Sequence, residues 1–408
     1  MNILILNAGS SSVKFGLFDA EARETLASGL IDWTADPQRA PLVIQRPGAE
    51  EVRSSVEVTD HRTALVHVVQ SLTGTAGGES GQDDVITGVG HRVVHGGAVF
   101  RDSVGIDDGV KAAIARFSEL APLHNPPALE GIEAAQSLLP GVPHVAVFDT
   151  AFYAHLPPSA YLYPVPYEWY TDWGIRRFGF HGISHAYCAG RAAELIGHDL
   201  RELRLVSCHL GNGCSATAVR GGKAVATTMG FTPMEGLMMG SRSGSIDPGI
   251  LFYIQQHRGI TAEQLDDLLN HRSGLLGVSG VSSDFRRVEA AARSGDERAR
   301  LALEMYAGRV RAAVGALAVT MGGVDGLIFT AGVGEHSASL RATVCEGLDC
   351  LGLRLDGQRN AVCQPDADIA TPDSPGRIVV IHTREELMIA RETRRVVCNL
   401  MNVDEQIR

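Results

Sequence analysis

The chain has 408 residues, a formal charge of −11, 45% hydrophobic residues and 20% charged residues. This length is enough for two or three domains with substantial cores, and the composition excludes a disordered or fibrous chain. The acidic charge, without long runs of lysine or arginine, argues against nucleic acid or an anionic membrane surface as the main partner.

The cysteines and the N-terminal sequence indicate the compartment. The seven cysteines contain no CxxC pair, so we expect free thiols rather than a disulfide framework or a zinc site. The N-terminal segment MNILILNAGSSS lacks the basic region of a signal peptide. No apolar run is as long as the roughly 18 residues of a membrane span. We therefore expect a cytoplasmic protein that does not bind membranes.

The first part of the chain reads as an α/β domain. The apolar run 3–6, the polar turn 7–12 and the run 13–18 predict two strands joined by a turn. Two helices and a strand are expected to follow, over about 107–120, 127–138 and 142–148. The last of these strands leads into Asp149, and ligands bind at the carboxyl ends of strands in open α/β sheets.

A similar hairpin returns about 200 residues later. The segments 203–210 and 215–219 predict two strands around the turn 211–213, and a third strand follows over 223–228. A further strand, 326–330, runs into a glycine-rich loop. Helices are expected over about 184–196, 261–271, 296–320 and 384–397.

The two similar hairpins suggest two related α/β domains, over 1–150 and 151–383. The segment 154–173 is rich in proline and tyrosine and is expected to cross between the domains. The C-terminal helix, within 384–408, is expected to pack back on the first domain.

Glycine is the compositional outlier, with 46 residues that cluster within 88–97, 211–249 and 322–334. Such clusters are typical of loops where the backbone approaches a ligand closely. There is neither a GxxxxGK[ST] nor a GxGxxG motif, which disfavours a P-loop and a dinucleotide-binding site. The polar hairpin 7–14 could hold phosphates with its amides, its serine hydroxyls and Lys14, or it could be a plain surface hairpin.

Three further segments place cationic or imidazole side chains beside glycines. Arg92 lies within 90–97, Arg242 within 230–249, and two histidines within 179–185. One such residue is usually structural, but three together favour an anion pocket of the kind that phosphoryl transfer requires. Asp149 and Glu385 could serve Mg²⁺, or they could form salt bridges or cap a helix.

Nine stretches in this order make the sequence resemble the acetate kinase family over essentially the whole chain. They are NAGSSSVKF (7–15), HRVVHGG (91–97), LHNPP (123–127), FDTAF (148–152), RFGFHG (177–182), HLGNG (209–213), EGLMMGSRSG (235–244), SGVSSDFR (279–286) and TREEL (383–387). The resemblance implies two duplicated ribonuclease-H-like domains around a central cleft, as in actin and hexokinase-like ATPases. It also implies a homodimer, and reversible phosphoryl transfer from ATP to acetate with Mg²⁺ or Mn²⁺, giving acetyl phosphate and ADP.

The resemblance also implies roles for individual residues. Asn7 and Glu385 would support the metal, Arg92 and Arg242 would hold the carboxylate and the transferring phosphoryl group, and His181 would stabilise the transition state. The implied acyl pocket comprises Val94, Leu123, Phe180 and Pro233. The implied ATP-binding residues are Lys14, His209, Leu210, Gly211, Asn212, Gly213, Asp284, Phe285, Arg286, Gly332, Val333, Gly334, Glu335 and His336. Asp149 would complete the catalytic set.

The acidity of the substrate limits the role of Asp149, and His336 departs from the family pattern. A simple carboxylic acid is already ionised at neutral pH, so the nucleophile needs no base, and we expect Asp149 to orient a magnesium ion, its waters or an arginine. His336 stands where the family often has asparagine, which leaves the nucleotide preference open. Tyr153, Ser245 and Arg287 also depart from the family pattern.

Two alternatives remain at this point. One extra methylene is worth only about 0.8 kcal/mol on burial, so propionate could be the substrate of such a generic apolar pocket. An actin-like or Hsp70-like ATPase is the alternative of a different class. Arg92 and Arg242 beside a small apolar pocket favour a small carboxylate over a protein partner.

Overall fold

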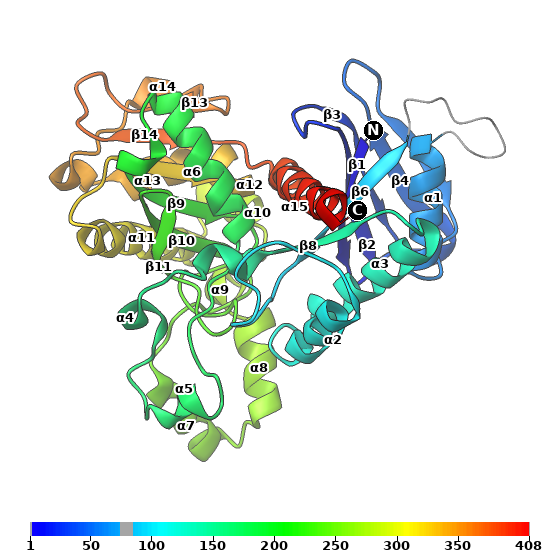
Figure 1. The fold of residues 1–408 in the computed structure, drawn as a ribbon. Helices are drawn as coiled ribbons and strands as arrows, with labels where there is room; N and C mark the ends of the chain where they lie inside the picture. The colour runs from blue at the N-terminus through cyan, green and yellow to red at the C-terminus, as the bar shows by residue number, and fades with distance from the viewer. Residues whose placement is uncertain (1, 74–84, 408) are drawn as a thin grey trace. The chain divides into compact units, whose positions relative to one another are not determined.

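The computed structural model describes residues 2–73 and 85–407. The chain divides into two compact units, one formed by Met1–Ala154 with Arg384–Arg408 and the other by His155–Thr383 (Figure 1). Ala154 lies a few residues beyond the boundary expected near residue 150. No helix in the described part of the chain is long and apolar enough to cross a membrane.

The first unit is built on a mixed sheet with the strand order β5-β4-β3-β2-β1-β6-β8-β7. Strands β1 to β5 form an antiparallel meander, whereas β1, β6 and β8 run parallel. The strands are β1 (Asn2–Gly9), β2 (Ser12–Asp19), β3 (Thr25–Asp32), β4 (Ala40–Gln45), β5 (Val52–Val56), β6 (Ile86–Val93), β7 (Val104–Gly105) and β8 (His144–Phe148).

Helices cover both faces of this sheet. Helices α1 (His61–Thr73) and α3 (Asn125–Leu138) pack on one face, and α15 (Glu385–Ile407) packs on the other (Figure 1). This arrangement explains why the run at 3–6 is apolar at every position, since a strand covered on both faces has no solvent side. A Cβ on Gly90 of β6 would lie 2.2 Å from Thr393 Oγ1 of α15, so glycine is needed for this close approach.

The second unit repeats the arrangement. Its sheet has the order β11-β10-β9-β12-β14-β13, in which β11, β10 and β9 are antiparallel and β9, β12 and β14 are parallel. The first unit shows the same five-strand pattern in β3-β2-β1-β6-β8, which confirms the predicted duplication of an α/β domain. The strands are β9 (Arg204–Leu210), β10 (Cys214–Arg220), β11 (Lys223–Thr227), β12 (Gly326–Thr330), β13 (Ala367–Asp368) and β14 (Arg377–Val380).

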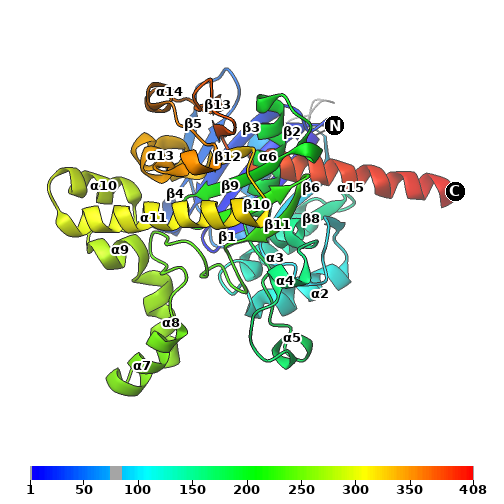
Figure 2. The same ribbon diagram turned by 90° about the vertical axis from the view of Figure 1, so that its left-hand side faces the viewer.

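Helices α6 (Gly182–Ile196) and α11 (Glu297–Thr320) cover the two faces of the second sheet. Helices α7 (Pro248–Arg258) and α8 (Ala262–His271) project away from it (Figure 2). The proline- and tyrosine-rich segment belongs to this unit from His155 onward and carries two short helices. The shorter helices of the chain are α2 (Asp108–Arg116), α4 (Pro158–Tyr161), α5 (Glu168–Thr171), α9 (Gly274–Ser279), α10 (Phe285–Arg293), α12 (Ala331–His336), α13 (Ala338–Cys345) and α14 (Gly357–Ala361).

Candidate active site

In the first unit, an arginine and an aspartate meet at the carboxyl ends of two parallel strands. Arg92 lies near the end of β6, and Asp149 directly follows β8. Arg92 Nη2 lies 2.7 Å from Asp149 Oδ2, and Arg92 Nε lies 3.4 Å from Oδ1. Because the Asp149 side chain is only 2% exposed, this ion pair is held with little screening by water.

The start of α15 brings two more carboxylates to the same unit. Glu385 Oε2 lies 3.8 Å from Arg92 Nη1, and Glu386 Oε1 lies 2.5 Å from the Lys14 ammonium on β2. Asn7 of β1 is the register partner of Lys14. The structure therefore brings Asn7, Lys14, Arg92 and Glu385 onto neighbouring elements, because α15 packs against β1, β2 and β6.

The charge of Arg92 is stabilised by these carboxylates. Burial by itself lowers the pKa of the guanidinium, but the nearby Asp149 and Glu385 outweigh burial and raise the pKa. Arg92 is therefore a permanent cation whose position is set by two acidic side chains.

The first unit contains Asn7 and Glu385, the two residues expected to support a metal ion. No group of three or more His, Cys, Asp or Glu side chains suited to a metal occurs among the described residues, so a dedicated protein cage is absent from them. Magnesium is commonly held by only one or two carboxylates together with waters and substrate phosphates. The oxygen donors of Asn7 and Glu385 fit that chemistry, and they are hard ligands without sulfur or imidazole.

In the second unit, His181 stands just before α6 in a left-handed conformation, with φ of 57°. Its Nδ1 lies 2.9 Å from Ser215 Oγ. Its ring stacks on His209, with centroids 4.1 Å apart and an interplanar angle of 18°. His209 Nδ1 is in turn 2.8 Å from Ser184 Oγ. A positive φ is costly for a side chain larger than glycine, so the surrounding contacts hold His181 in this orientation.

Arg242 converges on the same place. A Cβ built on Gly213 would lie 3.4 Å from His181 Nε2 and 3.8 Å from Arg242 Nη1. Burial lowers the pKa of Arg242, and no carboxylate in the described part of the chain forms an ion pair with it. A half-buried guanidinium without a carboxylate is suited to bind an anion from solution.

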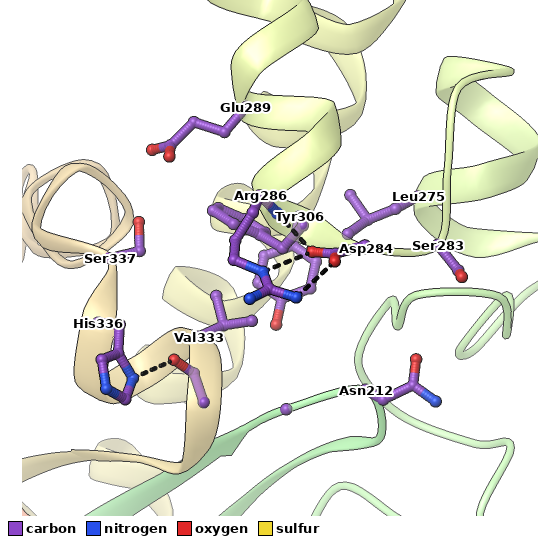
Figure 3. A pocket seen from close by; sticks show the side chains of 13 residues that line it. Asn212, Leu275, Ser283, Asp284, Arg286, Glu289, Tyr306, Val333, His336 and Ser337 are labelled. Carbon is purple, nitrogen blue, oxygen red and sulfur yellow. Dashed lines mark hydrogen bonds and ion pairs between the residues drawn. The ribbon is translucent and has the colours of Figure 1, made fainter.

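A cavity of about 660 Å³ opens beside this group in the second unit (Figure 3). One wall is apolar and aromatic, with Phe285 and Tyr306 in a T-shaped contact at 5.6 Å. Figure 3 shows Asp284 and Arg286 joined by an ion pair and His336 bonded to a backbone carbonyl, that of Gly332 at 2.9 Å. The lining residues are Gly211, Asn212, Leu275, Ser283, Asp284, Phe285, Arg286, Glu289, Tyr306, Gly332, Val333, His336 and Ser337.

Most of the predicted ATP-binding residues line this cavity. Others do not: Leu210 is fully buried in β9, and Lys14 belongs to the first unit. Glu335 is 4% exposed and accepts hydrogen bonds from the amides of Ala331 and Thr383, so it holds the backbone of this region together. His209, Gly213 and Gly334 also lie outside the lining, although His209 and Gly213 adjoin His181.

Five lining residues are absent from the predicted set. Ser283 lies inside the SGVSSDFR stretch and could have been found there. Tyr306 lies in the middle of α11, where its apolar spacing indicates only a core position. Leu275, Glu289 and Ser337 likewise carry no local signal, since only the tertiary packing brings them to the cavity.

The predicted acyl-pocket residues are divided between the units. Val94 and Leu123 belong to the first unit, where Leu123 is 59% exposed. Phe180 and Pro233 belong to the second, where Phe180 is 1% exposed and the carbonyl of Pro233 lies 3.4 Å from Arg242 Nη1.

Comparison with known proteins places these features in a family. The acetokinase family model matches residues 2–391. An acetate kinase from Cyanothece sp. is 51% identical over 403 residues, covering 97% of this chain and 98% of the relative. The crystal structure of Porphyromonas gingivalis acetate kinase superposes with a TM-score of 0.90 and 41% identity, covering 97% of this chain and 99% of that one.

A propionate kinase from Francisella tularensis is also similar, with a TM-score of 0.88, 38% identity, and coverage of 97% of this chain and 99% of that one. The likeness thus extends across both units in sequence and in structure. The predicted family is confirmed: the chain belongs to the acetokinase family.

Proposed function

We propose that this protein is an acetate kinase, an enzyme that transfers a phosphoryl group between ATP and acetate. The observation that carries the proposal is the turn 211–213 of the second unit. Gly211 and Asn212 line the cavity, while Gly213 adjoins His181 and Arg242. One short turn thus borders both a cavity large enough for a nucleoside and a pair of side chains suited to a phosphoryl group.

The chemistry requires charge stabilisation rather than a base. An oxygen of acetate forms a bond to the γ-phosphorus of ATP, the bond from that phosphorus to the bridging oxygen breaks, and ADP leaves. Acetate is already ionised at neutral pH, so no proton has to be removed from it. Arg92, Arg242 and His181 would bind and orient the anionic groups, and Asp149 would hold Arg92 in place.

Asn7 and Glu385 would hold a Mg²⁺ ion, which the family reaction uses. When bound, the ion neutralises charge on the phosphate oxygens of ATP. The ion pair between Lys14 and Glu386 lies beside this pair of ligands and would keep the start of α15 docked on β2.

Acetate is the preferred substrate in this proposal. Val94, Leu123, Phe180 and Pro233 are apolar, as the methyl group of acetate requires. Propionate kinase is the alternative, since the Francisella tularensis propionate kinase is similar to this chain over nearly its whole length.

We also propose a homodimer in the cytoplasm. Helix α7 has no buried residue, and it exposes Ile250, Phe252 and Tyr253 by 45%, 62% and 57%. Exposed apolar side chains on a helix that buries none of its own residues are suited to contact a second copy. Light scattering of the wild type and of Phe252→Glu tests this, and a monomeric wild type would contradict it.

The function is tested by measuring ADP release with and without acetate, while hydroxylamine traps the acyl phosphate. We expect both ADP and acetyl hydroxamate to require acetate. ATP turnover that does not depend on acetate would favour the actin-like or Hsp70-like alternative instead.

A further inference from the structure

Hydrogen bonds join a series of buried side chains that leads from His181 into the core of the second unit. We call this series the hydrogen-bond chain. Ser215 Oγ lies 2.9 Å from His181 Nδ1 and 2.8 Å from His185 Nε2. His185 Nδ1 lies 2.8 Å from Ser207 Oγ, which ends the chain. Ser215, His185 and Ser207 are all fully buried, with no exposed surface.

Three secondary-structure elements fix this chain. His185 lies on α6, one turn beyond the capping residue His181, and its amide donates to the His181 carbonyl at 3.0 Å. Ser215 lies at the start of β10, and Ser207 lies on the adjacent strand β9. Ser215, His185 and Ser207 are therefore placed by regular structure and not by a loop.

The number of available protons limits the directions in which the hydrogen bonds of this series can point. Burial lowers the pKa of His185 well below its usual value, so this imidazole is neutral and has one N–H donor and one acceptor nitrogen. The Ser215 hydroxyl has a single proton, which it can donate to only one of its two imidazole neighbours. The hydrogen bonds of the series can therefore point in only two ways, either all toward His181 or all toward Ser207.

Ser207, at the end of the hydrogen-bond chain farthest from His181, decides between the two directions. In one direction Ser207 donates to His185 Nδ1, His185 Nε2–H donates to Ser215, and Ser215 donates to His181 Nδ1. In the other direction Ser207 only accepts, and its own proton has no acceptor among the described residues, where His185 is its one hydrogen-bond partner. A buried donor without an acceptor is costly, so the first direction is favoured.

We propose that Ser215, His185 and Ser207 are positioning residues that fix the tautomer of His181. Because Nδ1 of His181 accepts from Ser215, the proton of the neutral ring is on Nε2. That nitrogen lies beside Gly213 and Arg242, where it can donate to an anionic oxygen. The inference rests on the proposed role of His181 in phosphoryl transfer and names what prepares it for that role.

The direct test is nitrogen NMR of the free protein, with ¹⁵N-labelled histidine, at pH 8. The His181 signals are identified by their loss in His181→Gln. We expect a protonated Nε2 and an unprotonated Nδ1 in the wild type. A wild-type ring with the proton on Nδ1 would overturn the proposal.

Ser207→Ala provides the sharper comparison, because Ser207 is two side chains away from His181. Without this hydroxyl, His185 Nδ1 lacks its partner in both directions, as an acceptor in the first and as a donor in the second. The preference for the first direction therefore weakens, and we expect the fraction of His181 protonated on Nδ1 to rise by about fivefold. Thr227→Val is the matched control, since Thr227 is a buried hydroxyl residue of the same sheet, bonded to Thr217 and outside the chain. The control should leave the His181 signals unchanged, and an unchanged spectrum in Ser207→Ala would contradict the proposal.

Kinetics give a second, independent readout. Ser215→Ala breaks the contact to His181, and we expect kcat to fall roughly tenfold while KM for ATP and acetate changes by less than about twofold. Full retention of kcat would contradict the positioning role. The NMR result needs no substrate, so a failure to form acetyl phosphate would overturn the proposed function and leave the tautomer assignment standing.

Discussion

Arg92 and Asp149 form a two-point ion pair, with Arg92 Nη2 2.7 Å from Asp149 Oδ2 and Nε 3.4 Å from Oδ1. The aspartate is 2% exposed and the arginine 18%. This geometry occupies both carboxylate oxygens of Asp149 with one guanidinium. It supports a role for Asp149 in holding Arg92, as expected from the acidity of the proposed substrate, rather than in removing a proton.

Asp149→Asn should therefore inactivate the enzyme without altering its dependence on pH. The amide cannot hold the guanidinium by charge, and we expect kcat to fall by about 10²- to 10³-fold at saturating Mg²⁺. The measurement is the pH–rate profile of the variant beside the wild type. Recovery of the rate at raised pH would instead indicate that Asp149 acts in proton transfer.

The matched control is the ion pair of Arg204 and Asp325 in the second unit, which also has two contacts, at 2.7 and 3.0 Å. It lies outside the proposed machinery. Asp325→Asn should lower the melting temperature modestly and leave kcat unchanged.

A second prediction concerns the wall of the cavity. A Cβ on Gly240 would lie 2.6 Å from both Asn212 Oδ1 and the backbone oxygen of Ser283, two residues of the lining. Gly240→Ala should displace them, at a cost of about 1–3 kcal/mol in the free energy of unfolding, and raise KM for ATP more than it lowers kcat.

Gly308→Ala is the control for that change. Gly308 lies within α11, and a Cβ there meets no atom within 4 Å. The alanine should stabilise the helix by about 0.5–1 kcal/mol and leave KM for ATP as it is. If both variants behave alike in calorimetry and kinetics, the close contact at Gly240 does not shape the cavity.

A third prediction concerns acyl specificity. We expect kcat/KM to be higher for acetate than for propionate by about tenfold or more, because a small pocket resists one added methylene. Val94→Ala should reduce that ratio by making room. The neighbouring Val93→Ala should destabilise the core by about 2 kcal/mol without changing the ratio, since Val93 is fully buried. A steady-state ranking of propionate above acetate would contradict the proposed substrate.

A fourth prediction concerns acid stability. Burial alone raises the pKa of Glu335, but hydrogen bonds from His382 and from the amides of Thr383 and Ala331 outweigh it and lower the pKa below 4.5. The carboxylate form therefore stabilises the fold above about pH 4.5, and this contribution is lost as the pH falls through the lowered pKa.

Glu335→Gln, which keeps an acceptor oxygen but no charge, should melt at a lower temperature than the wild type near neutral pH. The two melting temperatures should converge as the pH is lowered below about 4.5. Thermal melts across pH measure this, and a difference that widens on acidification would show that the ionised carboxylate does not stabilise the unit.

An element of the fold could be predicted from the sequence where residues close together in the chain are enough to specify it. The hairpin of β1 and β2 was predictable because an uninterrupted apolar run and a polar turn specify it locally. Strand β6 was not, because its sequence ITGVGHRV mixes glycine and charge. Glycine is needed at position 90 because α15 packs closely against β6 there. Arg92 forms ion pairs with Asp149 and Glu385, which lie far along the chain.

The candidate site shows the same limit. The residues in the family stretches were predictable, whereas Tyr306 was not, because its place in the cavity depends on how α11 crosses the second sheet. Glu335 looked like part of a nucleotide loop, yet its carboxylate bonds to the backbone of Thr383, which only the fold brings near.

Phosphorus NMR of the reaction mixture tests the central claim most directly. With ATP, Mg²⁺ and acetate present, the account predicts acetyl phosphate and ADP in equal amounts, and neither product when acetate is left out. The account would be contradicted if ADP and inorganic phosphate formed at the same rate with and without acetate, and no acyl phosphate formed when acetate was present.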